Sequence, residues 1–146
     1  MINYLFILFA IIAGLSQPIQ SGVNYELRNQ VHSAYLSGAI SNFIGAVIMV
    51  VVALFIEKNT SLGSLHNVSW WSLSGGIFSV IIVSSMIIVP TKISYSYFFT
   101  IFIAGQLIMA TIIDYFGWFG NEPVLLNTPR IVGIILVVTG VFLMKR

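Results

Sequence analysis

Five long stretches of mainly apolar residues, separated by short polar segments, run along the sequence. A helix needs about 20 such residues to cross the hydrocarbon core of a bilayer, and the last stretch is shorter than the other four. This pattern predicts an all-α integral membrane protein with five transmembrane helices. We expect these helices at approximately residues 4–27, 33–56, 70–89, 95–116 and 130–144.

The segments between the predicted helices are short and polar. Residues 28–32 form the first link, and residues 59–69 form a longer polar loop. Pro90 ends the third helix, and Pro123 and Pro129 act as breakers in the last loop. Because short links place successive helices side by side and antiparallel, we expect all 146 residues to form a single five-helix transmembrane domain.

The first predicted helix carries a polar face. Gln17, Ser21, Asn24 and Arg28 lie at offsets of 0, 4, 7 and 11, which places them on one helix face about 60° wide, and Gln20 flanks it. An unsatisfied polar group in hydrocarbon costs several kcal/mol, so this face cannot contact lipid. It must contact other helices or water inside a bundle, and we expect the other helices to be arranged around it.

Pro18 lies within this polar segment. A proline has no backbone N–H, so it leaves a carbonyl without its helical partner one turn earlier, near Gly14. We therefore expect the first helix to be broken here and Pro18 to act as a hinge.

Two interpretations of the polar face stay open. Polar side chains inside a membrane often line a pathway, and a broken helix offers free backbone groups to a substrate. Alternatively, Gln17, Gln20 and Asn24 bind neighbouring helices. Arg28 either belongs to the pathway or extends to the membrane surface, and we favour the second interpretation.

Small residues at helical spacing mark two further helices. Ser37, Ser41 and Gly45 follow one another at steps of four in the second, where Ala34 and Gly38 form another such pair. Small residues at this spacing let helix backbones approach closely, so we expect them to pack against a neighbouring helix.

The fifth helix has a comparable pair of small residues, and the second helix contains one polar residue with a possible role in the site. Gly133 and Gly140 lie seven residues apart and so on one face, which suits close packing against another helix or another subunit. Asn42 is a polar residue on the second helix, and we regard it as a possible accessory to the polar site.

The fourth predicted helix contributes two polar residues. Gln106 lies near its middle and either faces the polar residues of the first helix or makes a simple interhelical hydrogen bond. Asp114 lies near its end, where we favour a helix-end or loop partner over a proton carrier. Tyr95 and Tyr97, at its start, are expected to anchor the helix at the membrane surface.

Composition agrees with a membrane protein. Hydrophobic residues make up 58% of the chain and charged residues 7%, against about 45–50% and 25% in ordinary soluble domains. The mean hydropathy is +1.02. The net charge is +2 without a basic patch, so nucleic acid is not an expected partner.

Catalytic and metal-binding chemistry has little support in the sequence. There are no cysteines and two histidines, so we expect neither disulfides nor a metal site, and no cofactor. We find no nucleophile elbow and no Gly-rich phosphate loop after a strand. The sequence therefore predicts that the protein is not an enzyme.

The charged residues in the links give a weak orientation signal. With five helices, Lys58 and Arg130 lie on one side of the membrane. The opposite side carries four cations, which are Arg28, Lys92, Lys145 and Arg146. This bias favours an N-terminus outside and a C-terminus inside, but it is too small to fix one orientation, so insertion both ways up is expected to be possible.

Several motifs together resemble a known family. They are Gln17-Pro18, Asn24, Leu27-Arg28, Ala104-Gly105-Gln106-Leu107, Asp114-Tyr115-Phe116-Gly117-Trp118-Phe119-Gly120, Arg130-Ile131-Val132-Gly133 and Gly140-Val141. With these motifs the chain resembles, over nearly its whole length, the YdcZ-like family of bacterial inner-membrane proteins, which is grouped with the drug/metabolite transporter superfamily. The resemblance implies a multi-pass protein of the bacterial inner membrane.

The resemblance also implies a mode of assembly. Larger members of the superfamily have ten helices arranged as two inverted halves, and a five-helix chain resembles one half. This implies pairing with an inverted copy, as a homodimer, or with a related inverted partner. The four-helix multidrug relatives use a glutamate in the first helix, and here the resemblance fails, because Glu26 lies too close to the helix end.

We therefore expect a small transporter that moves a polar or amphipathic metabolite by alternating access as an inverted dimer. Its pathway would be lined by Gln17, Ser21, Asn24 and Gln106. The alternative is a membrane scaffold or accessory subunit whose polar residues only hold helices together. A lipid-modifying enzyme would need a catalytic set that the sequence does not contain.

Overall fold

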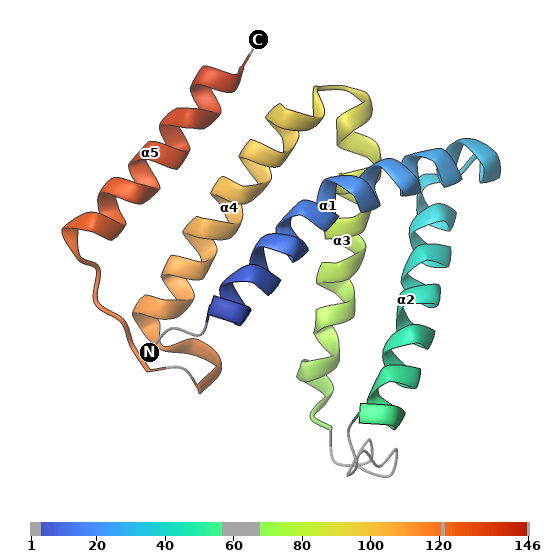
Figure 1. Cartoon of the computed structure of the whole chain (residues 1–146), viewed down its shortest axis with the longest axis horizontal. Helices are drawn as coiled ribbons and strands as arrows, with labels where there is room; N and C mark the ends of the chain where they lie inside the picture. Colours follow the sequence, from blue (N-terminus) through green and yellow to red (C-terminus); the bar gives the residue numbers. More distant parts are fainter. Residues whose placement is uncertain (1–3, 57–67, 121, 146) are drawn as a thin grey trace. The chain divides into compact units, whose positions relative to one another are not determined.

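Five α-helices make up most of residues 4–56, 68–120 and 122–145, which are the residues that this computed structural model describes (Figure 1). These residues contain no strand, so the predicted all-helical fold is confirmed. The helices are α1 (Tyr4–Val31), α2 (Ala34–Ile56), α3 (Gly75–Ile88), α4 (Tyr95–Phe116) and α5 (Thr128–Met144). Short 3₁₀ segments are η2 (Trp70–Ser74), η3 (Val89–Thr91) and η4 (Trp118–Gly120).

The lengths of these elements suit a membrane protein. Four segments are long and apolar enough to cross a bilayer, and the fifth, Thr128–Met144, is a shorter apolar helix of 17 residues. The four long segments are Tyr4–Val31, Ala34–Ile56, Trp70–Thr91 and Tyr95–Phe116. They match the first four predicted helices within a few residues.

Two features of the first helix differ from the prediction. The helix continues through the expected polar link as far as Val31, and the turn to α2 is made at His32, whose φ is 54°. The helix is also unbroken at Pro18. Proline is tolerated in a transmembrane helix because the loss of one backbone hydrogen bond leaves the others in place. A hinge at Pro18 stays a prediction.

The ends of the last two helices are set by local caps. The Ser94 side chain accepts a hydrogen bond from the Tyr97 backbone N–H at 3.3 Å, and α4 ends at the left-handed Gly117. The Asn127 side chain caps α5 in the same way, so α5 begins at Thr128, two residues before the expected start. Pro129 is therefore not a breaker but part of the first helical turn, where its missing N–H has no partner to lose.

Contacts between the helices divide the chain into two compact units, Met1–Val89 and Pro90–Arg146. In the first unit α1 packs against both α2 and α3, and these two helices pack against each other. This agrees with the expectation that other helices surround the polar face of α1. The second unit is a hairpin of α4 and α5. The single five-helix domain stays a prediction, and most of the expected polar loop at residues 59–69 lies outside the described residues.

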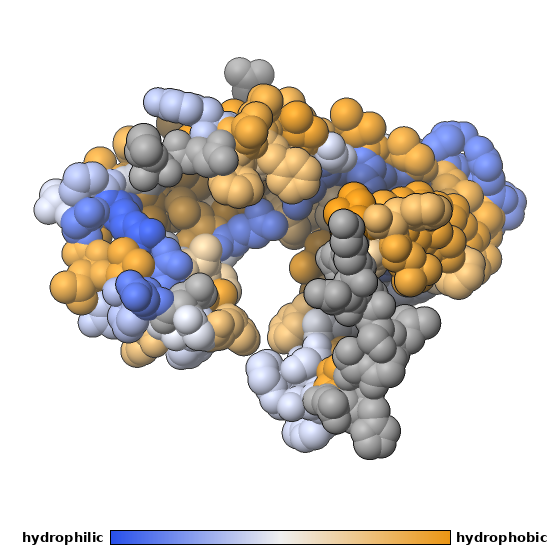
Figure 2. Space-filling model, turned by 60° about the horizontal axis from the view of Figure 1, so that its bottom comes forward, coloured by the Kyte–Doolittle hydropathy of each residue, from blue (hydrophilic) through white to orange (hydrophobic). Residues whose placement is uncertain are grey.

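A few polar residues are buried in this structure, and many large apolar residues are exposed. Ser21 and Ser37 are fully buried, whereas Phe43 and Phe55 are 70% and 85% exposed. Figure 2 shows the apolar residues as broad orange areas on the surface. A surface of this kind is stable in lipid, where exposed apolar side chains meet acyl chains instead of water.

Close helix packing is concentrated at one point of α2. Ser37 and Gly38 are buried there, and a Cβ on Gly38 would lie 3.1 Å from Val83 Cγ1 and 3.5 Å from Ile87 Cδ1 of α3. A Cβ on Gly45, Gly133 or Gly140 would meet no atom within 4 Å. The backbone approach that small residues permit is therefore observed at Gly38, and the packing roles of Ser41, Gly45, Gly133 and Gly140 stay predictions.

We expect Gly38→Leu to destabilise the first unit by about 1–3 kcal/mol, because a large side chain would overpack the contact with α3. Gly45→Leu is the matched control, since it makes the same change on the same helix into open space. The measurement is the unfolding free energy in mixed micelles during an SDS titration. Equal losses in the two variants would contradict this account of the packing.

Candidate functional site

The polar face of α1 is held in place by hydrogen bonds between helices. The buried Ser21 hydroxyl donates to the Met86 carbonyl of α3. The buried Ser37 hydroxyl of α2 donates to the Asn24 carbonyl at 2.6 Å. Ser21 and Asn24 thus lie at the junction of the three helices of the first unit. The Ser21 side chain thus binds a neighbouring helix, whereas Asn24 contributes its backbone carbonyl.

The remaining polar residues of this face are less enclosed. Gln17 is half-buried and Gln20 is exposed, and neither side-chain amide makes a hydrogen bond within the described residues. The Arg28 guanidinium lies 6.0 Å from the centre of the Tyr25 ring, and its buried Nη1 has no hydrogen-bond partner in the same part of the chain. On the polar face of α1, the two glutamine amides and one guanidinium nitrogen of Arg28 are therefore without a hydrogen-bond partner among the described residues.

Asn42 forms a second polar contact in the first unit. Its side-chain amide donates to the Ser79 hydroxyl of α3 at 3.5 Å, the long end of a hydrogen bond. A cavity of about 130 Å³ lies beside it between α2 and α3. This is small for a metabolite, since ligand pockets usually have volumes of about 300–1,000 Å³. Asn42 therefore connects two helices.

Gln106 belongs to the second unit, where it is exposed on α4. Its amide makes no hydrogen bond with any described residue. The sequence grouped Gln106 with three residues that lie in the first unit, and that grouping stays a prediction. The structure brings Ser21 and Asn24 together, with Gln17 one turn before Ser21 on the same helix.

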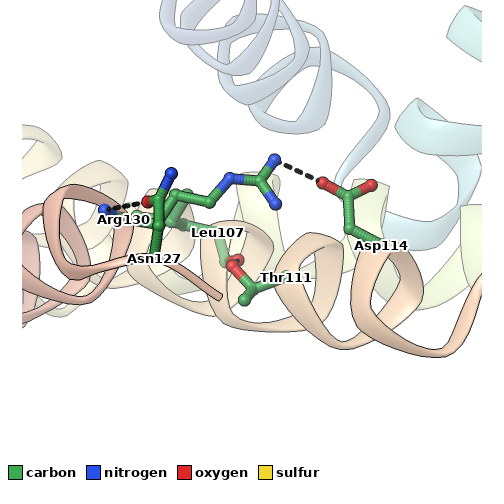
Figure 3. A network of polar contacts seen from close by, with 5 residues as sticks. All are labelled: Leu107, Thr111, Asp114, Asn127 and Arg130. Atoms are coloured by element: carbon green, nitrogen blue, oxygen red, sulfur yellow. Dashed lines mark hydrogen bonds and ion pairs between the residues drawn. The ribbon is translucent and has the colours of Figure 1, made fainter. Parts of the chain in front are cut away.

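An ion pair joins α4 to α5. Arg130 Nη2 lies 2.7 Å from Asp114 Oδ2 (Figure 3). The backbone around the pair is tied as well, because the Asp114 carbonyl accepts from the Val124 N–H at 2.9 Å and the Asn127 side chain accepts from the Arg130 N–H at 3.0 Å. Asp114 is thus a helix-end and loop partner, the role that we favoured.

Sequence analysis missed the partner of Asp114, which lies 16 positions further along the chain. One signal was available. Asp114 and Arg130 stand at the two ends of the loop that joins two antiparallel helices, so both had to lie near the same membrane surface. A carboxylate and a guanidinium at the same surface form the obvious pair.

A groove of about 320 Å³ lies between α4 and α5, next to the ion pair. It is mainly apolar, with the charged pair and Thr111 as its polar part, and the Thr111 hydroxyl donates to the Leu107 carbonyl (Figure 3). A Cβ on Gly133 would meet nothing within 4 Å, so the groove is open at this glycine. The lining residues are Leu107, Ala110, Thr111, Asp114, Arg130, Gly133, Ile134 and Val137.

Metal ligands are not gathered at any of these places. In the described ranges there is no group of three or more His, Asp or Glu side chains that could hold a metal ion. The polar groups at these places are amides, hydroxyls, backbone carbonyls, the Arg28 guanidinium and one ion pair. Such groups bind and orient polar compounds through hydrogen bonds.

The comparison with protein families gave one match. The sequence model of a family described as "Putative inner membrane exporter, YdcZ" matches residues 5–143, which is nearly the whole chain. No curated protein and no solved structure matches the chain.

The Asp114–Arg130 pair should stabilise the α4–α5 hairpin. We expect Asp114→Asn and Arg130→Gln each to destabilise it, and the double variant to lose less than the sum of the two single losses. The coupling free energy should be about 1 kcal/mol, because both side chains are more than a third exposed. The measurement is a double-mutant cycle of unfolding free energies in micelles. Additive losses would show that the two charges act independently.

Proposed function

The chain belongs to the YdcZ family of inner-membrane exporters, and from this premise we propose that it moves a small polar or amphipathic metabolite by alternating access. It is a multi-pass protein of the inner membrane. The proposal concerns the kind of substrate, the residues that bind it and the assembly that exposes them to each side in turn.

The observation that carries the proposal is the pair of free amides on Gln17 and Gln106. Both lie well inside apolar helices, and neither has a hydrogen-bond partner among the described residues. A polar group without a partner is costly in hydrocarbon, so such residues usually face water, a substrate or another subunit. Amides both donate and accept hydrogen bonds, which suits a neutral or zwitterionic polar compound better than a simple cation.

Ser21 and Asn24 have a supporting part in this proposal. Their buried bonds to α3 and α2 fix the rotation of α1 about its axis, and so fix the direction in which Gln17 points. Pro18 stands directly after Gln17, where the lost backbone hydrogen bond lowers the resistance of the helix to bending. A hinge there would let the two halves of α1 move separately while Gln17 stays at the centre.

We further propose that two such chains, or this chain and a related partner, pair in inverted orientation. The near balance of cationic residues between the two sides supports insertion both ways up. Inverted pairs of helical units create a central site at mid-membrane, and rocking of one unit against the other exposes it alternately. The open surfaces at Gly45 and Gly140 offer places for a second chain to approach.

The competing function is a membrane scaffold or accessory subunit. The observation that favours it is that Ser21 and Asn24 are already engaged in helix packing. In that case the glutamines would hold a partner subunit and would bind no substrate. Leucine substitutions of the glutamines distinguish the two functions. They should reduce transport if the protein is a transporter, and they should weaken assembly if it is a scaffold.

We expect Gln17→Leu and Gln106→Leu each to reduce export about tenfold, because each removes a hydrogen bond to substrate within the membrane. Expression and oligomeric state should be unchanged. Export is measured by untargeted mass spectrometry of the medium of cells that produce each variant. Gln30→Leu is the matched control, since Gln30 is an exposed residue in the last turn of α1, on the side opposite Gln17.

The outcomes separate the two functions. Normal export by both glutamine variants would overturn the site. Loss of assembly together with loss of export would favour the scaffold. Asn24→Leu should also reduce export, but its buried position makes a loss of folding part of the expected result.

Labelling of a single cysteine placed after Arg146 tests the inverted pair. The chain has no cysteine of its own, so the label has no background. We expect a membrane-impermeant reagent to label part of the protein from outside and the rest only after permeabilisation. Labelling from one side alone would remove the inverted homodimer and leave a separate inverted partner or the scaffold.

A further inference from the structure

A large cavity lies at the end of the α4–α5 hairpin opposite to the Asp114–Arg130 pair. It measures about 970 Å³ and is formed where the segment before α4 meets the last turn of α5. Figure 1 shows the start of α4 and the end of α5 at the same end of this hairpin. The lining residues are Thr91, Lys92, Ile93, Ser94, Ser96, Tyr97, Leu143, Met144 and Lys145.

Two cationic residues line this cavity. Lys92 and Lys145 are 53 positions apart in the sequence, and only the hairpin brings them to one place. The described residues contain four Lys or Arg side chains in all, so half of them line this one cavity. Neither lysine forms an ion pair with a carboxylate of the described chain. The described residues that line the cavity therefore include two cationic side chains and no carboxylate.

The other lining residues complete an amphipathic site. Ser94 and Ser96 place their hydroxyl oxygens 3.4 Å apart beside the lysines, where both can turn toward an anion. Ile93, Leu143 and Met144 supply an apolar wall in the same cavity. Two ammonium groups, two hydroxyls and an apolar wall suit a compound with an anionic, hydrogen-bond-accepting head and a hydrocarbon body.

The depth of the cavity indicates which compound that is. It lies at the ends of α4 and α5, so in the bilayer it stands at the level of the polar headgroups. Basic pockets between transmembrane helices at this level bind anionic lipid headgroups. We propose that this cavity binds an anionic phospholipid, with the phosphate between Lys92 and Lys145 and the glycerol and upper acyl chain against Ile93, Leu143 and Met144. This site is separate from the proposed transport pathway and does not depend on what the chain exports.

The test measures lipid binding to the purified full-length chain in a neutral detergent. Phosphatidylglycerol and phosphatidylcholine are added in turn, and native mass spectrometry counts the lipid that stays bound. We expect tighter binding of phosphatidylglycerol. Each of Lys92→Gln and Lys145→Gln should weaken it about fivefold, and the double variant about 30-fold.

Two controls separate the site from general charge and from misfolding. Arg28→Gln removes another cation of the same predicted membrane side that does not line the cavity, and it should leave binding unchanged. The variant Lys92→Arg with Lys145→Arg keeps both charges and should bind within about twofold of the original chain, because phosphate accepts hydrogen bonds from either cation. Its retained binding keeps the test valid even where the glutamine variants fold poorly.

Three results would overturn the proposal. They are equal binding of the two lipids, unchanged binding in the Lys92→Gln and Lys145→Gln double variant, and an equal loss in Arg28→Gln. A last measurement adds inorganic phosphate as a competitor of the bound lipid. If phosphate at equal concentration displaced the lipid completely, the apolar wall would contribute nothing, and the site would belong to a soluble phosphate compound instead of a lipid.

Discussion

The structure depends on one constraint, which is that a polar group within hydrocarbon needs a partner inside the protein. The first unit meets it by turning the polar face of α1 inward. Ser21 and Ser37 each donate to a backbone carbonyl of another helix, so that α1, α2 and α3 are joined at one place. Gly38 favours this close approach, because a Cβ at this position would lie 3.1 Å from Val83 Cγ1 of α3 and a large side chain would overpack the contact.

The same constraint explains where charge is found. The ion pair of Asp114 and Arg130 lies at one end of the α4–α5 hairpin, and the two lysines of the large cavity lie at the other. Between them the hairpin presents apolar residues, the amide of Gln106, and hydroxyls bonded to their own helix, as those of Thr100, Thr111 and Thr139 are. Charges thus lie near the membrane surfaces, where water and lipid headgroups can solvate them.

The sequence predicted the helices well because the length of an apolar stretch is a direct measure of a membrane span. It failed at Pro18 and Pro129, since the effect of a proline depends on where the helix starts and on which hydrogen bond is lost. Helical spacing found the inward face of α1 but not the partners of its residues. The partners of Ser21 and Asp114 lie on other helices, and no local pattern encodes such contacts.

The candidate residues fall into two groups, those whose polar atoms form hydrogen bonds within the protein and those whose polar atoms do not. The Ser21 hydroxyl and the backbone carbonyl of Asn24 are engaged within the first unit, and loss of these two hydrogen bonds would cost folding free energy. The amides of Gln17 and Gln106 form no hydrogen bond within the unit to which each belongs, and a polar side chain without a partner raises the free energy of a helix in the membrane. A sequence that keeps such residues must gain from another contact, with a substrate, with water or with a second chain. The free amides therefore support the proposed site more directly than the buried hydroxyl of Ser21 does, although helical spacing placed Gln17 and Ser21 on the same face of α1.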